Sequence, residues 1–117
     1  AGFKKFSEAK NAKISFVLIP SKVSVYENID LIRLHEEDVK LGYDEILSWA
    51  KKVELDFDQP RGIYKRISNK YGIEVIDITE IFRQHRDDTR LYYDVDTHWT
   101  ADGQKLAGDY VASALSR

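Results

Sequence analysis

Ile14-Ser15-Phe16-Val17-Leu18-Ile19-Pro20 is a nearly continuous apolar run that a proline closes. Such a run is typical of a strand that is covered on both faces in a parallel sheet, and proline rarely continues a strand. We therefore predict a strand over residues 14–19 and place the chain in the α/β class. The following segment, residues 21–26, is expected to leave the carboxyl edge of the sheet, where open α/β folds bind their ligands.

A second strand is predicted over residues 73–78, where apolar and polar residues alternate more than in the first strand. That alternation favours a position nearer the edge of the sheet. A helix should precede it, because Pro60 suits a helix start, Gly72 suits a helix end, and apolar residues recur between them at helical spacing. A helix, a glycine and a strand in this order form half of a βαβ unit.

The remaining segments also favour helices. Residues 2–11 are predicted to form a short amphipathic helix, and another short helix should start at residues 79–82. The last helix is predicted over residues 100–117, with Thr100 as its N-cap. The charged stretch 27–58 should be helical with a break at Gly42, and its intermittent apolar stripe consists of Leu31, Leu34, Leu41, Ile46, Leu47, Ala50 and Val53.

Length and composition limit the kind of protein. A chain of 117 residues is at most one domain, here residues 1–117, and is short for a complete three-layer α/β fold. The formal charge of −2 gives no reason to expect a nucleic-acid partner, and the absence of cysteine excludes disulfides and thiolate chemistry. No segment has the pattern of a membrane span or signal peptide. Because the chain begins with Ala1, we expect a processed product or a piece of a larger protein.

The segment that looks suited to chemistry is Asp94-Val95-Asp96-Thr97-His98-Trp99-Thr100-Ala101-Asp102-Gly103. A histidine that acts as a general base needs an acceptor on its other ring nitrogen, which fixes the tautomer and stabilises the imidazolium. In an extended segment, residues two apart point to the same side. Asp96 and His98 are therefore the candidate catalytic pair.

Two other readings of this segment remain open. Asp94, Asp96 and His98 alternate and could offer three ligands to a divalent cation. A second histidine would be needed to strengthen that reading, but His35 and His85 lie in polar stretches typical of the surface. We therefore predict no metal site.

The other reading is a non-catalytic carbohydrate-binding or interaction module. Trp99, with Tyr92 and Tyr93 nearby, could stack on a sugar ring. Lys22, just beyond the first strand, is a candidate to orient an anionic or acyl-bearing substrate. Trp99 and Lys22 are thus candidate substrate-binding residues.

Asp96-Thr97-His98-Trp99-Thr100, followed by Gly103, resembles the final block of the SGNH/GDSL hydrolase superfamily, and is most similar to its alginate-acetyltransferase-like (polysaccharide O-acetyltransferase) branch. Three further segments resemble blocks of the same branch: Ile19-Pro20-Ser21-Lys22 with Val25-Tyr26, then residues 72–77, and Leu91-Tyr92-Tyr93. The resemblance implies a partial three-layer, flavodoxin-like SGNH fold, in which helices flank a small, mainly parallel sheet. It also implies that residues 1–117 are the C-terminal part of such a domain.

The resemblance further implies a Ser-His-Asp triad, in which His98 deprotonates the serine and Asp96 orients the imidazole. The substrate would be an acylated small molecule or a polysaccharide, and no cofactor is implied. The family's Gly-Asp-Ser-like turn and its Gly and Asn oxyanion donors are missing from this sequence, and Ser21 is the best substitute. We therefore expect that the chain is a fragment of an ester hydrolase or an O-acetyltransferase. The catalytic serine should come from elsewhere, and the chain alone should be inactive.

Two expectations concern the setting of the protein. The family resemblance suggests a location in the cell envelope or outside the cytoplasm. A sheet with few strands leaves an open edge, and an open edge favours self-association. We therefore expect that the chain can form a homodimer through this edge.

Overall fold

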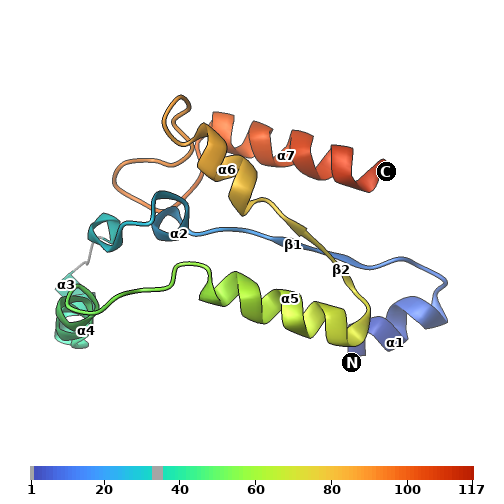
Figure 1. Cartoon of the computed structure of the whole chain (residues 1–117), viewed down its shortest axis with the longest axis horizontal. Coiled ribbons are helices and arrows are strands. Elements are labelled where there is room, and N and C mark those ends of the chain that lie inside the picture. Colours follow the sequence, from blue (N-terminus) through green and yellow to red (C-terminus); the bar gives the residue numbers. More distant parts are fainter. Residues whose placement is uncertain (1, 33–35) are drawn as a thin grey trace.

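The computed structural model describes residues 2–32 and 36–117 and has a mixed α/β architecture (Figure 1). Leu34, which the sequence assigns to the apolar stripe, and His35, which it assigns to the surface, lie outside the described residues. The radius of gyration is 17.0 Å, whereas a compact domain of this length should have about 13 Å. The fold is therefore open, with much of its apolar surface facing solvent.

The sheet in the described part of the chain has two strands, and they run parallel as predicted. Strand β1 (Ser15–Leu18) pairs with β2 (Glu74–Asp77), so that Ser15 faces Glu74 and Leu18 faces Asp77. Each strand is one residue shorter at both ends than the sequence indicates. The parallel pairing brings the segments that follow Leu18 and Asp77 to the same edge of the sheet.

The connection between the strands is more broken than predicted. It contains α2 (Lys22–Tyr26), the 3₁₀ helix η1 (Ile29–Leu31), α3 (Glu36–Lys40), α4 (Tyr43–Ala50) and α5 (Gln59–Tyr71). The break at Gly42 is confirmed, since this residue takes a positive φ of 81° before α4. The helical reading of residues 51–58 is wrong: this stretch forms turns, one of them closed by a hydrogen bond from the Asp58 amide to Asp56 Oδ1.

Helices lie on both sides of the sheet. Helix α5 lies on one side of the strands, and α7 (Ala101–Leu115) with α6 (Thr79–His85) lies on the other (Figure 1). Gly72 ends α5 in the left-handed conformation, with a φ of 62°, as its position predicts. The N-terminal helix α1 (Gly2–Ala9) leads into β1. Within residues 2–32 and 36–117, no helix combines the length and apolar character needed to cross a bilayer.

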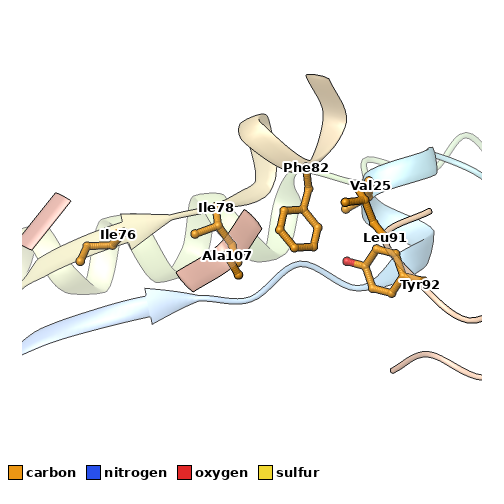
Figure 2. Close-up of a cluster of buried hydrophobic side chains, with 7 residues drawn as sticks. All are labelled: Val25, Ile76, Ile78, Phe82, Leu91, Tyr92 and Ala107. Atoms are coloured by element: carbon orange, nitrogen blue, oxygen red, sulfur yellow. The ribbon is translucent and has the colours of Figure 1, made fainter. Parts of the chain in front are cut away.

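The hydrophobic core lies on the α6 and α7 side, near the carboxyl end of the strands. Figure 2 shows the Phe82 ring of α6 between Ile78 and the side chains that come from α2 and from the segment before α7. Phe82 packs edge-on against Tyr92, with ring centroids 5.9 Å apart. The buried members of this cluster are Val25, Ile76, Ile78, Phe82, Leu91, Tyr92 and Ala107.

The opposite side of the strands is only partly covered. The prediction that the first strand is buried on both faces is wrong for the described residues, because Phe16 and Val17 remain 44% and 42% exposed. Neighbouring β2 pairs with one edge of β1. An apolar groove of about 510 Å³ lies between the strands and α5, and its lining includes Phe16 of β1, Val75 of β2 and Ile67 of α5. Such a surface fits the expected self-association, but the homodimer stays a prediction.

A cluster of charges closes the carboxyl end of β2. Oδ2 of Asp77 lies 2.9 Å from Arg61 Nε and 2.8 Å from Lys65 Nζ, while Oδ1 accepts a 3.0 Å hydrogen bond from the Thr79 amide. Burial alone would raise the pKa of Asp77, but these donors outweigh it and hold the pKa well below its ordinary value. The carboxylate therefore ties α5 and the start of α6 to the sheet.

This ion cluster predicts a pH dependence of stability. A carboxyl group with a folded pKa below its unfolded value stabilises the fold above the unfolded pKa, near 4, and the contribution falls as pH drops toward the folded pKa. Asp77→Asn should lower the free energy of unfolding at pH 7 by roughly 3 kcal/mol, because two cations lose a nearly buried partner. Urea titrations from pH 7 to pH 2 should also show a shallower acid decline than in the wild type.

The matched control is Asp109→Asn, which removes an exposed carboxylate that pairs with Lys105 on α7. This change should leave both the stability at pH 7 and its acid decline within about 0.5 kcal/mol of wild type. If Asp77→Asn behaved like the control, the ion cluster would not be a source of stability.

Candidate active site

The candidate catalytic residues lie in a short loop between α6 and α7. Its base is closed by an antiparallel bridge between Tyr92 and Trp99, with the Tyr93 amide donating to the His98 carbonyl at 3.1 Å. A further bond joins the Thr100 amide to the Leu91 carbonyl at 3.0 Å. We call residues 93–98 the histidine loop. Backbone pairing fixes the base of this loop, and the tip of the loop therefore projects beyond the end of β2.

Asp96 and His98 lie side by side, although in a turn and not in an extended strand. Oδ1 of Asp96 accepts a 2.8 Å hydrogen bond from the His98 amide, which is the geometry of an Asx turn. Oδ2 lies 3.5 Å from Nδ1 of His98. That separation exceeds a normal hydrogen bond, as is common for catalytic pairs before substrate binds. The pairing therefore directs the carboxylate to Nδ1 and leaves Nε2 as the nitrogen available to a reacting group.

The pair is open to solvent. The side chain of His98 is 84% exposed and that of Asp96 is 49% exposed. Among the described residues, Asp96 is the sole side chain that contacts the His98 imidazole through a hydrogen bond or ion pair. An imidazole in this position can meet a partner that approaches from outside the loop.

Lys22, predicted to contact substrate, lies against the histidine loop. Its side-chain nitrogen donates to the carbonyl oxygens of Tyr93, at 2.7 Å, and of Asp94, at 3.3 Å. The residue is 9% exposed. Two of its three N–H donors are thus directed at the backbone of the loop.

Tyr92 ties the histidine loop to the first strand, a role that neither its possible stacking nor its place in the Leu91-Tyr92-Tyr93 block predicted. Its hydroxyl donates to the Pro20 carbonyl at 2.8 Å, so the base of the histidine loop is tied to the segment just after β1. Burial raises the pKa of Tyr92 to about 12. The only sequence signal was its place beside the Asp-x-His block, because its burial arises from tertiary packing.

Trp99, the other candidate for substrate binding, is half-buried. Its ring packs on Phe82 with centroids 5.1 Å apart and planes tilted by 51°. The aromatic side chain therefore joins the core to the histidine loop. Its contact with substrate stays a prediction, and Tyr93 is the more exposed aromatic residue of this segment.

Two residues at the start of α7 fix where the loop ends. Thr100 is the N-cap of α7, as predicted, and its Oγ1 accepts a 3.1 Å hydrogen bond from the Gly103 amide. Gly103 was not predicted to matter for packing, yet a Cβ atom there would lie 2.3 Å from the Leu91 carbonyl oxygen. A glycine in the first turn of an otherwise regular helix was the available signal.

The other candidates from the sequence lie apart from the imidazole. Ser21 caps α2, and its Oγ bonds the Ser24 amide and hydroxyl. Within residues 2–32 and 36–117, no serine hydroxyl is hydrogen-bonded to His98, and no three acidic or histidine side chains are grouped as metal ligands. The carboxylate of Asp94 instead pairs with Arg90 at 2.7 Å.

These observations define an α/β domain in which Asp96 and His98 lie side by side beyond the carboxyl edge of a parallel sheet. A family model described as the SGNH hydrolase-like domain of acetyltransferase AlgX matches residues 2–117, and the chain therefore belongs to this family. Comparison with curated proteins and with solved structures found no match.

Proposed function

We propose that this chain supplies the Asp and His of a Ser-His-Asp triad in an SGNH-type ester hydrolase or O-acetyltransferase that acts on acyl groups of a polysaccharide. The proposal is carried by the Asp96 and His98 pair, in which a carboxylate oxygen lies 3.5 Å from Nδ1 while the rest of the imidazole is open. Membership of the acetyltransferase family supports the acyl-transfer chemistry.

The expected reaction uses both ring nitrogens of His98. Nε2 takes the proton from a serine hydroxyl as its oxygen attacks the acyl carbonyl, and later returns that proton to the departing alkoxide. Water or an acceptor hydroxyl then attacks the acyl-serine while His98 removes its proton, the bond between the acyl carbon and the serine oxygen breaks, and His98 returns the proton to that oxygen. Asp96 holds the Nδ1–H tautomer and stabilises the imidazolium that forms in each step.

The proposed serine comes from outside these 117 residues. Two observations support this part of the proposal. No described serine is hydrogen-bonded to His98, and the His98 side chain is 84% exposed to solvent. A nucleophile held by another segment could reach Nε2 without displacing anything that the structure describes. Oxyanion donors would come from the same source.

The test compares the longer polypeptide that carries this chain with the 117-residue chain by itself. Both are assayed for p-nitrophenolate release from p-nitrophenyl acetate and for acetate release or acetyl transfer with an acetylated polysaccharide. The long form should turn over both substrates, and the short form should not. If the short form showed turnover, the proposal of an external serine would be wrong. If the long form showed no turnover, the proposal that the protein is an enzyme would be wrong. Saturable polysaccharide binding without turnover would favour the carbohydrate-binding alternative.

A further inference from the structure

Lys22 has an unusual environment for a lysine. It begins α2, directly after the Ser21 cap, and it is 9% exposed. Lysines are rarely buried unless a charge or several polar groups surround the ammonium, since removing this ion from water is costly. In the described part of the chain Lys22 has no carboxylate partner, and its acceptors are two neutral carbonyl groups. The placement therefore needs an explanation other than a salt bridge.

Those two carbonyl groups belong to the first two residues of the histidine loop. The contacts join residues that are 71 and 72 positions apart in the sequence, so Lys22 connects the end of β1 to the far end of the chain. Tyr92 makes a parallel connection through its hydroxyl to Pro20, also across 72 positions. The segment 20–22 thus holds the segment 92–94 at two points.

The Lys22 contact continues to the catalytic candidates through one residue. The carbonyl of Tyr93 accepts from Lys22, and the amide of Tyr93 donates to the His98 carbonyl at 3.1 Å. The peptide groups on both sides of Tyr93 are therefore fixed, one by the ammonium and one by His98. Among residues 2–32 and 36–117, no other side chain forms a hydrogen bond or ion pair with Asp96 at the tip of the loop, and its carboxylate interacts with His98 within the turn.

We propose that Lys22 is the positioning residue of the Asp96 and His98 pair, because its ammonium fixes the histidine loop through the Tyr93 and Asp94 carbonyls. The inference rests on the proposed catalytic role of that pair. Lys22 acts through the loop backbone and makes no contact with the reacting atoms. Without it, the loop would remain attached at its base but would sample other orientations, and His98 would meet the nucleophile less often.

The test uses Lys22→Met in the long polypeptide, labelled with ¹⁵N at histidine. At a pH where the imidazoles are neutral, long-range ¹H–¹⁵N spectra give the tautomer of each histidine. Wild-type His98 should be enriched in the Nδ1–H form that a carboxylate at Nδ1 favours, and Lys22→Met should shift it toward free imidazole. His85, which lies 3.5 Å from Asp88 by the same kind of contact on α6, is the internal control and should not change.

Kinetics provide the second measurement. Lys22→Met should lower kcat roughly 10–100-fold with KM nearly unchanged, because misplacing a catalytic group slows chemistry without removing a substrate contact. Lys22→Arg, which keeps the charge and several donors, should recover part of the loss. The matched control is Lys105→Met, on the exposed face of α7, which should match the wild type in both measurements.

The outcomes separate this inference from the proposed function. A folded Lys22→Met protein with unchanged His98 signals and kcat would overturn the positioning role, even if His98 itself proved essential. A rise in KM alone would instead assign Lys22 to substrate binding and also overturn it. If circular dichroism showed that Lys22→Met was not folded, the same measurements would be made on Lys22→Gln. If His98→Ala kept full turnover while Lys22→Met shifted the His98 signals, the proposed function would fail and the structural link would stand.

Discussion

Replacing His98 with alanine is expected to lower kcat for ester cleavage on the order of 10⁴-fold, with a much smaller change in KM. The reason is that an unassisted serine hydroxyl is a weak nucleophile and the departing alkoxide loses its proton donor. The measurement is initial-rate kinetics on p-nitrophenyl acetate, with the proposed longer polypeptide that would carry this chain and the serine. Circular dichroism should show no change, because the His98 side chain is exposed and its backbone keeps its bond to Tyr93.

Asp96→Asn should cost on the order of 10³–10⁴-fold in kcat, because an amide can hold the wrong tautomer of His98. The double variant should be little worse than His98→Ala alone, since residues that act as a unit are not additive. The chain offers a close control in His85→Ala, because His85 Nδ1 also lies 3.5 Å from a carboxylate, that of Asp88. His85→Ala should keep wild-type turnover.

Equal turnover in the wild type, His98→Ala and Asp96→Asn would end the triad proposal. The comparison with His85 tests whether activity depends on the position of the Asp and His pair in the fold as well as on the 3.5 Å contact. What distinguishes the pair at residues 96 and 98 is its place in a loop at the carboxyl edge of the sheet, within a chain of the SGNH hydrolase-like family.

Gly103→Ala is expected to destabilise the fold by about 3 kcal/mol. The new Cβ would lie 2.3 Å from the Leu91 carbonyl oxygen and 3.3 Å from Trp99 Cβ. The Leu91 oxygen cannot move aside freely, because it accepts the Thr100 amide in the pairing that closes the histidine loop. The expected result is a lower urea midpoint, together with altered amide shifts across residues 91–100.

Gly108→Ala provides the matched control on the same helix. A Cβ at Gly108 meets nothing within 4 Å, so alanine should raise helix stability by up to about 1 kcal/mol. A common effect of both substitutions would contradict the close approach at Gly103. A loss confined to Gly103→Ala, with the loop shifts described above, would support it.

The sequence predicted the elements whose signals are local. The apolar run before Pro20, the Gly72 cap and the Thr100 cap each depend on a few neighbouring residues, and the structure confirms them. The exposure of β1 was not predictable in this way. A nearly continuous apolar strand indicates that both faces are to be covered, but the sequence pattern does not say which segment covers them.

The candidate site was predictable to a similar extent. The pairing of Asp96 with His98 is a contact between residues two apart, so a spacing argument could anticipate it, although the Asx turn differs from the extended geometry assumed. The contacts of Lys22 and Tyr92 join residues more than 70 positions apart. Their positions depend on the pairing of β1 with β2, and no local sequence pattern predicts contacts between residues so far apart in the chain.

These long connections also bear on the order in which the molecule assembles. The sheet pairs residues 59 positions apart, such as Ser15 and Glu74, and such a contact must overcome the entropy of closing a long loop. Helices such as α7 form from neighbours and need no such closure. The histidine loop reaches its final position only after β1 has docked, because Pro20 and Lys22 hold it. During refolding, helical content should therefore return before the Asp96 and His98 pair is in place.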